Sequence, residues 1–136
     1  MTPEKLIEQA IEAMTHAYAP YSGYKGGAAL RRADGTVYTG CNIENASYTP
    51  TVCAERTAFF KAAYDGHRDF TAIAVCGGKD GVITSLFPPC GVCRQVMREF
   101  CRDDFMGYMA GPNGTWEGYP LIEMLPHSFS AAEHMA

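Results

Sequence analysis

Two short segments of the chain carry a group of residues that the fold has to bring together. The first is Cys53-Ala54-Glu55, and the second, well separated from it, is Pro89-Cys90-Gly91-Val92-Cys93. Cysteine thiolates bind zinc, and structural zinc sites are closed by four protein ligands, whereas catalytic sites keep one position open. Since the pattern offers three cysteines and no obvious fourth ligand, it predicts a zinc site that performs chemistry.

The Cys-x-x-Cys spacing of Cys90 and Cys93 has a competing interpretation as a redox-active thiol pair. The third cysteine, Cys53, with an acid two residues after it, favours zinc over that interpretation. We expect Cys53 and Cys90 near the starts of two helices, where the partial positive charge of the helix end favours the thiolate form.

The residues beside the cysteines suggest acid–base chemistry at the metal. Glu55 can carry protons between water and a substrate, although the residue alone also fits an ordinary acid in a first helical turn. Three thiolates give a zinc centre a net negative charge, so a neighbouring cation is expected. Arg56 and Arg94 can each hydrogen-bond a ligand sulfur, but Arg56 fits an exposed helix charge equally well.

Asn42 and Glu44 stand on either side of Ile43, directly after a predicted strand. A buried amide and a carboxylate two residues apart can both hydrogen-bond the hydroxyls of a ribose. The alternative is a turn whose polar side chains are solvated. The four histidines show no ligand spacing, and we predict that they are non-catalytic.

Periodic apolar residues, prolines and glycines predict alternating helices and strands, which favours an α/β sheet flanked by helices. The first helix begins at Thr2-Pro3-Glu4 and is ended by Pro20, and Thr51 is expected to cap the second. The second and third helices span 51–64 and 91–101, with a helical turn at 121–125. Strands are predicted over 26–32, 36–42, 71–76, 105–110 and 115–118.

The chain of 136 residues is long enough for one domain, predicted over 1–129, with a disordered tail at 130–136. A net charge of −4 argues against nucleic-acid binding and favours a small ligand. Without a secretory signal or an apolar run of about 20 residues, we expect a cytoplasmic protein that does not bind membranes. In that compartment disulfides are disfavoured, and Cys41, Cys76 and Cys101 are expected to be packing residues.

Nearly the whole chain resembles the small, zinc-dependent cytidine deaminases. The resemblance rests on five segments: Ala19–Ser22, Gly27–Leu30, Gly40–Tyr48, Thr51–Ala58 and Pro88–Gln95. It implies a three-layer α/β/α sandwich with a mixed five-stranded sheet. It also implies hydrolytic deamination of cytidine and 2′-deoxycytidine to uridine and 2′-deoxyuridine plus ammonia, a reaction of pyrimidine salvage.

The resemblance further implies a role for each matched residue of the site. Cys53, Cys90 and Cys93 correspond to the ligands of one Zn²⁺ per subunit. Glu55 corresponds to the proton shuttle and Arg56 to a donor of hydrogen bonds to the thiolates.

The nucleoside itself is expected to contact a second set of residues. Asn42 and Glu44 correspond to ribose-binding residues, and the backbone of Ala54 to a contact with the base. The family forms homotetramers with shared active sites, in which Tyr48 lies near the sugar of a neighbouring subunit and Phe129 over its base.

The chain departs from the family pattern at two places. Tyr24 and Gly26 replace a usual phenylalanine and valine, although Tyr24 keeps an aromatic face for stacking on the base. His127 and Ser128 replace small residues in the C-terminal motif. Two alternatives stay open. One is a deaminase of another aminopyrimidine nucleoside such as a nucleoside antibiotic, and the other is a structural zinc module with a fourth protein ligand.

Overall fold

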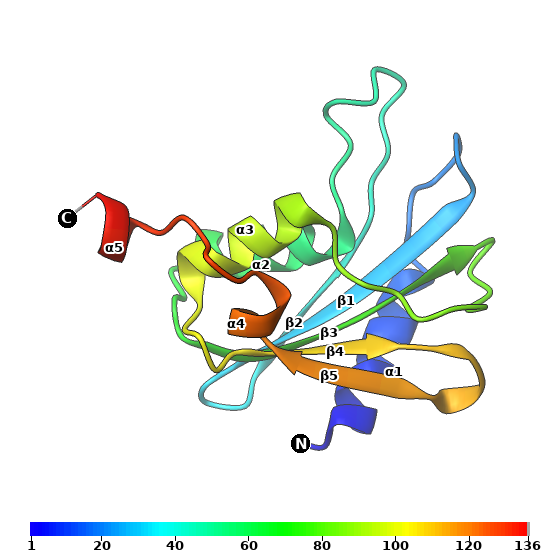
Figure 1. Cartoon of the computed structure of the whole chain (residues 1–136). Helices are drawn as coiled ribbons and strands as arrows, with labels where there is room; N and C mark the ends of the chain where they lie inside the picture. Colours follow the sequence, from blue (N-terminus) through cyan, green and yellow to red (C-terminus); the bar gives the residue numbers. More distant parts are fainter. Residues whose placement is uncertain (136) are drawn as a thin grey trace.

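A mixed five-stranded sheet forms the middle layer of the computed structural model, which describes residues 1–135 (Figure 1). The strand order is β2-β1-β3-β4-β5. Only β3 and β4 pair in parallel, and the other neighbours are antiparallel. The strands are β1 (Tyr24–Arg32), β2 (Val37–Cys41), β3 (Phe70–Lys79), β4 (Met106–Ala110) and β5 (Trp116–Pro120).

Helices cover both faces of the sheet and complete the three layers. Helix α1 (Pro3–Met14) packs on one face, and α2 (Ala54–Tyr64) and α3 (Gly91–Phe100) lie on the other (Figure 1). The predicted three-layer α/β/α sandwich with a mixed five-stranded sheet is therefore confirmed. The remaining short elements are η1 (Pro112–Gly114), α4 (Leu121–Met124) and α5 (Ala131–His134). Within residues 1–135, every helix is too short or too polar to span a bilayer.

Helix α2 begins later than its sequence predicts, because Thr51 is not its cap. Val52 exchanges two backbone hydrogen bonds of 3.0 Å with Ile43, which holds this segment extended. The Thr51 hydroxyl instead accepts from the backbone N–H of Asn45 at 3.1 Å. The first helical residue is then Ala54, and Cys53 becomes the N-cap residue.

The first helix also ends before the predicted boundary at Pro20. Its last helical residue is Met14, because Tyr18 forms backbone hydrogen bonds with the segment that follows β2. The Tyr18 N–H donates to the Asn42 carbonyl at 3.0 Å, and the Glu44 N–H donates to the Tyr18 carbonyl at 2.9 Å. Segment 18–23 is thereby held beside residues 42–44. At the other terminus, α5 lies inside the predicted tail, and Ala136 falls outside the described residues.

The two faces of the sheet bury different kinds of side chain. Leu30, Ile73 and Val75 pack with Phe59 of α2 on the face that carries α2 and α3. The opposite face presents mainly alanines to α1, together with Cys76 and partners from the helix such as Leu6. The small side chains let α1 lie close to the sheet.

Helix α1 approaches the sheet closely at Gly27. A Cβ atom at this position would lie 2.0 Å from the Ala10 carbonyl oxygen and 2.6 Å from the Met14 nitrogen. Both are backbone atoms that cannot move independently of the helix. The neighbouring Gly26 faces the other side, where a Cβ would meet nothing nearer than the Cys76 carbonyl oxygen at 3.6 Å.

We expect Gly27→Ala to lower the free energy of unfolding by at least about 2 kcal/mol, because it forces α1 away from the sheet. Gly26→Ala is the matched control and should change that free energy by less than about 1 kcal/mol. Urea unfolding of the metal-loaded proteins measures both values. Equal unfolding midpoints for the two variants would contradict the packing described here.

Candidate metal centre and active site

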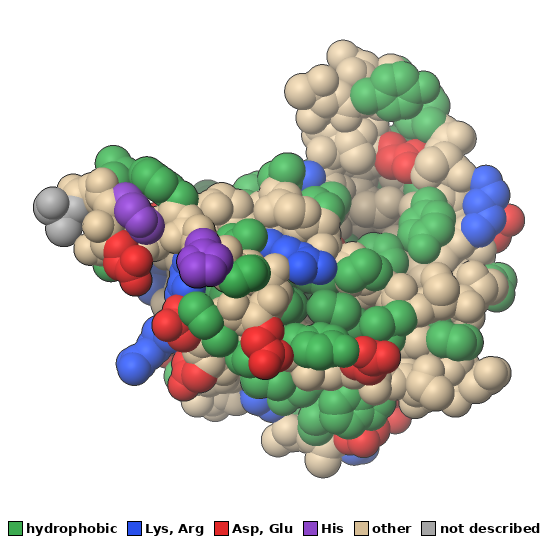
Figure 2. Space-filling model, viewed as in Figure 1, with side chains coloured by type: hydrophobic (Ala, Val, Ile, Leu, Met, Phe, Trp, Pro, Cys, Tyr) green, Lys and Arg blue, Asp and Glu red, His purple; other side chains and the backbone are tan. Residues whose placement is uncertain are grey.

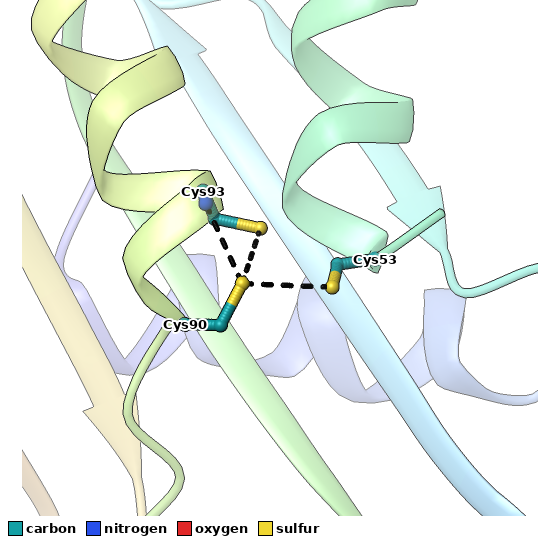
Figure 3. A group of neighbouring side chains, drawn as sticks. All are labelled: Cys53, Cys90 and Cys93. Atoms are coloured by element: carbon teal, nitrogen blue, oxygen red, sulfur yellow. Dashed lines mark hydrogen bonds between the residues drawn. The ribbon is translucent and has the colours of Figure 1, made fainter. Parts of the chain in front are cut away.

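Three cysteine sulfurs meet where α2 and α3 begin (Figure 3). The Sγ atoms of Cys53, Cys90 and Cys93 all lie within 4.8 Å of one another. The distance is 3.8 Å between the sulfurs of Cys53 and Cys90, and 3.4 Å between those of Cys90 and Cys93. The fold therefore brings together the three residues that the sequence selects as ligands.

Helix starts position these sulfurs. Cys53 is the N-cap residue of α2, Cys90 is the N-cap residue of α3, and Cys93 stands in the first turn of α3. The Cys90 sulfur accepts a hydrogen bond from the Cys93 backbone N–H at 3.4 Å, as an N-cap side chain does. Both helix dipoles place partial positive charge at the cluster and favour thiolates.

A side-chain cation also faces the cluster. Arg56 Nη2 donates to the Cys53 sulfur at 3.4 Å. The neighbouring Cys93 thiol, followed by the Arg56 guanidinium, lowers the pKa of Cys53 to about 5. The nearby Cys53 sulfur, together with burial, raises the pKa of the Cys93 thiol far above its usual value. Arg94 points elsewhere and donates to the carbonyls of Pro89 and Met124.

The donor set fits zinc. Tetrahedral zinc with Zn–S bonds of about 2.3 Å places its sulfur ligands about 3.8 Å apart, close to the separations seen here. Among the described residues, the group contains these three cysteines and no further histidine, cysteine or carboxylate. Cys76 and Cys101 are instead buried, and burial raises the pKa of Cys76 to about 12. The fourth protein ligand that a structural zinc module requires is not part of the cluster in residues 1–135.

Glu55 is the one charged side chain that is fully buried within the described part of the chain, with 2% of its surface exposed. Burial raises its pKa to about 7, and the negative charge of Cys53 adds to the effect. Residues two apart within a regular helix do not share a face. Cys53 is an N-cap residue with extended backbone, so this rule does not separate its side chain from that of Glu55. A carboxyl group with such a pKa can accept and return a proton near neutral pH.

Asn42 is bound to the start of β1. Its Nδ2 donates to the Tyr24 carbonyl at 2.8 Å, and its Oδ1 accepts from the Gly26 N–H at 2.9 Å. The space that a side chain at Gly26 would occupy is 3.8 Å from both Asn42 Oδ1 and the Ala54 Cβ. Asn42, Gly26 and Ala54 therefore line one region. Ala54 is the residue directly before Glu55 in the chain.

Glu44 is bound to the turn before β1. One carboxylate oxygen accepts from the N–H groups of Tyr21 at 3.0 Å and Ser22 at 3.1 Å, and the other accepts from the Ser22 hydroxyl. These bonds, led by the hydroxyl, lower the pKa of Glu44. The involvement of Ser22 has no local sequence signal, because the two residues are far apart in the chain.

The three aromatic residues of the predicted site are at the surface of the chain. Tyr24 stacks on Phe87 with ring centroids 6.1 Å apart. Tyr48, with a positive φ of 63°, stands in the loop between β2 and α2 that projects from the body (Figure 1). Phe129 belongs to the C-terminal segment and stacks on His134. Tyr48 is 75% exposed and Phe129 58%, so their own subunit leaves most of each ring uncovered.

Comparisons with known proteins agree with this geometry. Residues 1–109 match the family model described as the cytidine and deoxycytidylate deaminase zinc-binding region. A cytidine deaminase from Sporosarcina psychrophila is 48% identical over 96% of this chain and 93% of its own. The crystal structure of a cytidine deaminase from Burkholderia pseudomallei superposes with a TM-score of 0.88 at 44% identity, covering 95% of this chain and 100% of that one.

One similar protein has a different activity in its name. A blasticidin-S deaminase from Bacillus cereus is 29% identical over 93% of this chain and 91% of its own length. Its identity is well below the 48% of the relative from Sporosarcina psychrophila.

We expect Cys90→Ala to lose zinc, because the remaining two sulfurs cannot hold the ion as three do. Metal analysis after dialysis should fall from about one zinc per chain to a small fraction of that value. Cys41→Ala removes a half-buried cysteine outside the cluster and should keep its zinc. Full occupancy in the Cys90 variant would mean that another residue supplies the third ligand.

Proposed function

The chain belongs to the zinc-binding family of cytidine and deoxycytidylate deaminases, and we propose that it hydrolyses the 4-amino group of cytidine and 2′-deoxycytidine. The products are uridine or 2′-deoxyuridine and ammonia. We further propose that the enzyme acts in pyrimidine salvage in the cytoplasm. The observation that carries this proposal is the cluster of three sulfurs next to the buried Glu55.

The cluster of Cys53, Cys90 and Cys93 would hold one zinc ion per chain. When bound, zinc supplies a Lewis acid that makes water nucleophilic near neutral pH. Three thiolates weaken that effect, because their negative charges lower the electrophilicity of the site. Arg56 and the two helix starts oppose the loss by drawing negative charge away from the sulfurs.

Glu55 moves the protons of the reaction. It takes a proton from the attacking water and delivers it to the ring nitrogen N3 as the water oxygen bonds to C4. A second transfer moves the remaining proton of that oxygen to the amino group as the C4–N bond breaks, which leaves the C4 carbonyl and releases ammonia. Burial keeps the carboxyl group out of bulk water and gives it a pKa of about 7, which suits both transfers.

The nucleoside is oriented by residues around Glu55. Within the protein, the Asn42 amide donates one hydrogen bond and accepts one. Its second N–H hydrogen and its second oxygen lone pair stay available for a ribose hydroxyl. Glu44 accepts a hydrogen bond from a second ribose hydroxyl. The Ala54 backbone contacts the base, and the ring of Tyr24 offers a face on which the base can stack. The space at Gly26 lies beside the Ala54 and Asn42 side chains, so the missing side chain affects the room left for the nucleoside there.

A second candidate function is deamination of an aminopyrimidine nucleoside antibiotic. The similarity to a blasticidin-S deaminase favours it, and the missing side chain at Gly26 leaves room for a substrate larger than cytidine. The higher identity to cytidine deaminases favours the first candidate.

The purified zinc protein should consume cytidine and 2′-deoxycytidine, followed by the loss of their ultraviolet absorbance. Free cytosine and cytidine monophosphate should react at least about 100-fold more slowly, because cytosine lacks the ribose and the monophosphate carries an added charge. Blasticidin S should also react more slowly than cytidine. Faster turnover of blasticidin S than of cytidine would select the second candidate.

We expect Glu55→Gln to reduce kcat by about 10²–10⁴-fold, because the amide cannot carry the proton. Zinc content and unfolding temperature should stay close to those of the parent. Glu8→Gln, an exposed change on α1, is the matched control and should leave kcat unaltered. A Glu55→Gln enzyme that keeps more than about a tenth of the parental rate would remove Glu55 from the mechanism.

We also propose that the enzyme is a homotetramer with active sites shared between subunits. Large hydrophobic side chains are exposed on the outer surfaces of α2 and α3, including Phe60, Tyr64 and Val92. Hydrophobic side chains are also spread over the face that Figure 2 presents. Exposed apolar surface is typical of contacts between subunits where it is contiguous. In the assembly, Tyr48 and Phe129 would each reach the site of a neighbouring chain.

Mixing two defective variants, one with a raised KM and one without activity, tests the shared site. Phe129→Ala should raise KM for cytidine by about tenfold or more while zinc content is kept, because an aromatic contact to the base is lost. When it is refolded together with inactive Glu55→Gln, hybrid tetramers should regain sites that combine an intact Glu55 with an intact Phe129. Light scattering measures the assembly. A fully active monomer, or the absence of any regained activity in hybrids, would contradict the shared site.

A further inference from the structure

The carboxylate of Glu44 is fixed by a single turn of the chain. Its three hydrogen bonds within residues 1–135 come from two consecutive residues, Tyr21 and Ser22, which precede β1. The two N–H donors share one oxygen, and the Ser22 hydroxyl is the only donor to the other oxygen among the described residues. The hydroxyl therefore determines how the carboxylate is rotated.

The direction of the Ser22 hydroxyl is itself determined. Its oxygen accepts the Tyr24 N–H at 2.9 Å, and its one hydrogen is free to be donated to Glu44. The Ser22 carbonyl accepts from Lys79 Nζ at 2.6 Å, at the end of β3. The next residue, Gly23, adopts a positive φ of 70° and accepts from the Asp80 N–H at 2.7 Å. The turn is thus attached to the end of β3 through the carbonyls of Ser22 and Gly23.

The arrangement leaves Glu44 with a defined place for one more donor. An ionised carboxylate has about four acceptor positions, of which the turn fills three. The vacant position is on the oxygen that the Ser22 hydroxyl holds. Hydrogen bonds from a hydroxyl to a carboxylate are charge-assisted and short, so they restrict rotation strongly. A ribose hydroxyl that approaches Glu44 would meet an acceptor whose direction is already set.

We propose that Ser22 is a positioning residue that aligns Glu44 with a ribose hydroxyl of the nucleoside, so that it controls KM and leaves the chemical step unaffected. The inference rests on the proposed function, in which Glu44 binds the ribose. The competing role for Ser22 is purely structural, namely stabilisation of the turn 19–23.

Steady-state kinetics with cytidine separate these roles. Ser22→Ala should raise KM about tenfold and change kcat less than twofold, as expected for a lost hydrogen bond to a charged group. Ser22→Thr keeps the hydroxyl, so its KM should stay close to that of the parent enzyme. Ser85→Ala, at an exposed serine whose hydroxyl makes none of the side-chain hydrogen bonds found in residues 1–135, is the matched control.

A double-mutant cycle with Glu44→Ala gives the decisive readout. If Ser22 acts through Glu44, Ser22→Ala should raise KM in the parent and add less than twofold in the Glu44→Ala background. An equal rise in both backgrounds, or a lowered unfolding temperature with unchanged KM, would overturn the positioning role. A Glu44→Ala enzyme with parental KM would instead show that the ribose-binding role in the proposed function is wrong, whatever Ser22 does.

Discussion

The site depends on the side-by-side placement of the first turns of α2 and α3 on one face of the sheet. This placement brings the Cys53 and Cys90 sulfurs to 3.8 Å. The sheet accommodates it because β2 carries no side chain at Gly40, where a Cβ would lie 2.4 Å from the Ala54 carbonyl oxygen. A shift of either helix start by one side-chain width would separate the sulfurs. The close packing of the helices on the sheet therefore also fixes the geometry of the metal ligands.

The same helix starts also place positive and negative groups side by side at the site. They place partial positive charge beside thiolates, and α2 adds both Arg56 against Cys53 and the buried carboxyl group of Glu55. A proton carrier, a cation and a ligand therefore come from one short stretch of chain. The ribose-binding candidates come from a different source, the backbone pairing of residues 42–44 with segment 18–23. Chemistry and substrate orientation are thus supported by separate parts of the fold.

Local patterns predicted most of this structure, and contacts between distant segments account for what they missed. The strands and the three main helices follow from periodicity, and the Cys90–Cys93 pair follows from ligand spacing. Cys53 joined that pair in the prediction because Cys53-x-Glu55 fits the pattern of a catalytic zinc site. Thr51 has the side chain of a helix cap, yet pairing of Val52 with Ile43 prevents that role. Likewise, no local pattern reveals that Ser22 holds Glu44. The roles of Tyr48 and Phe129 stay predictions, because they require a second subunit.

X-ray absorption at the zinc edge of the purified protein tests the central claim, a zinc site held by three cysteines with one position open. The spectrum should fit three sulfur neighbours at about 2.3 Å and one lighter neighbour. Addition of a competitive nucleoside inhibitor should alter the lighter shell and leave the sulfur shell unchanged. Four sulfur neighbours, or a first shell that does not respond to the inhibitor, would identify a closed structural site and contradict the account.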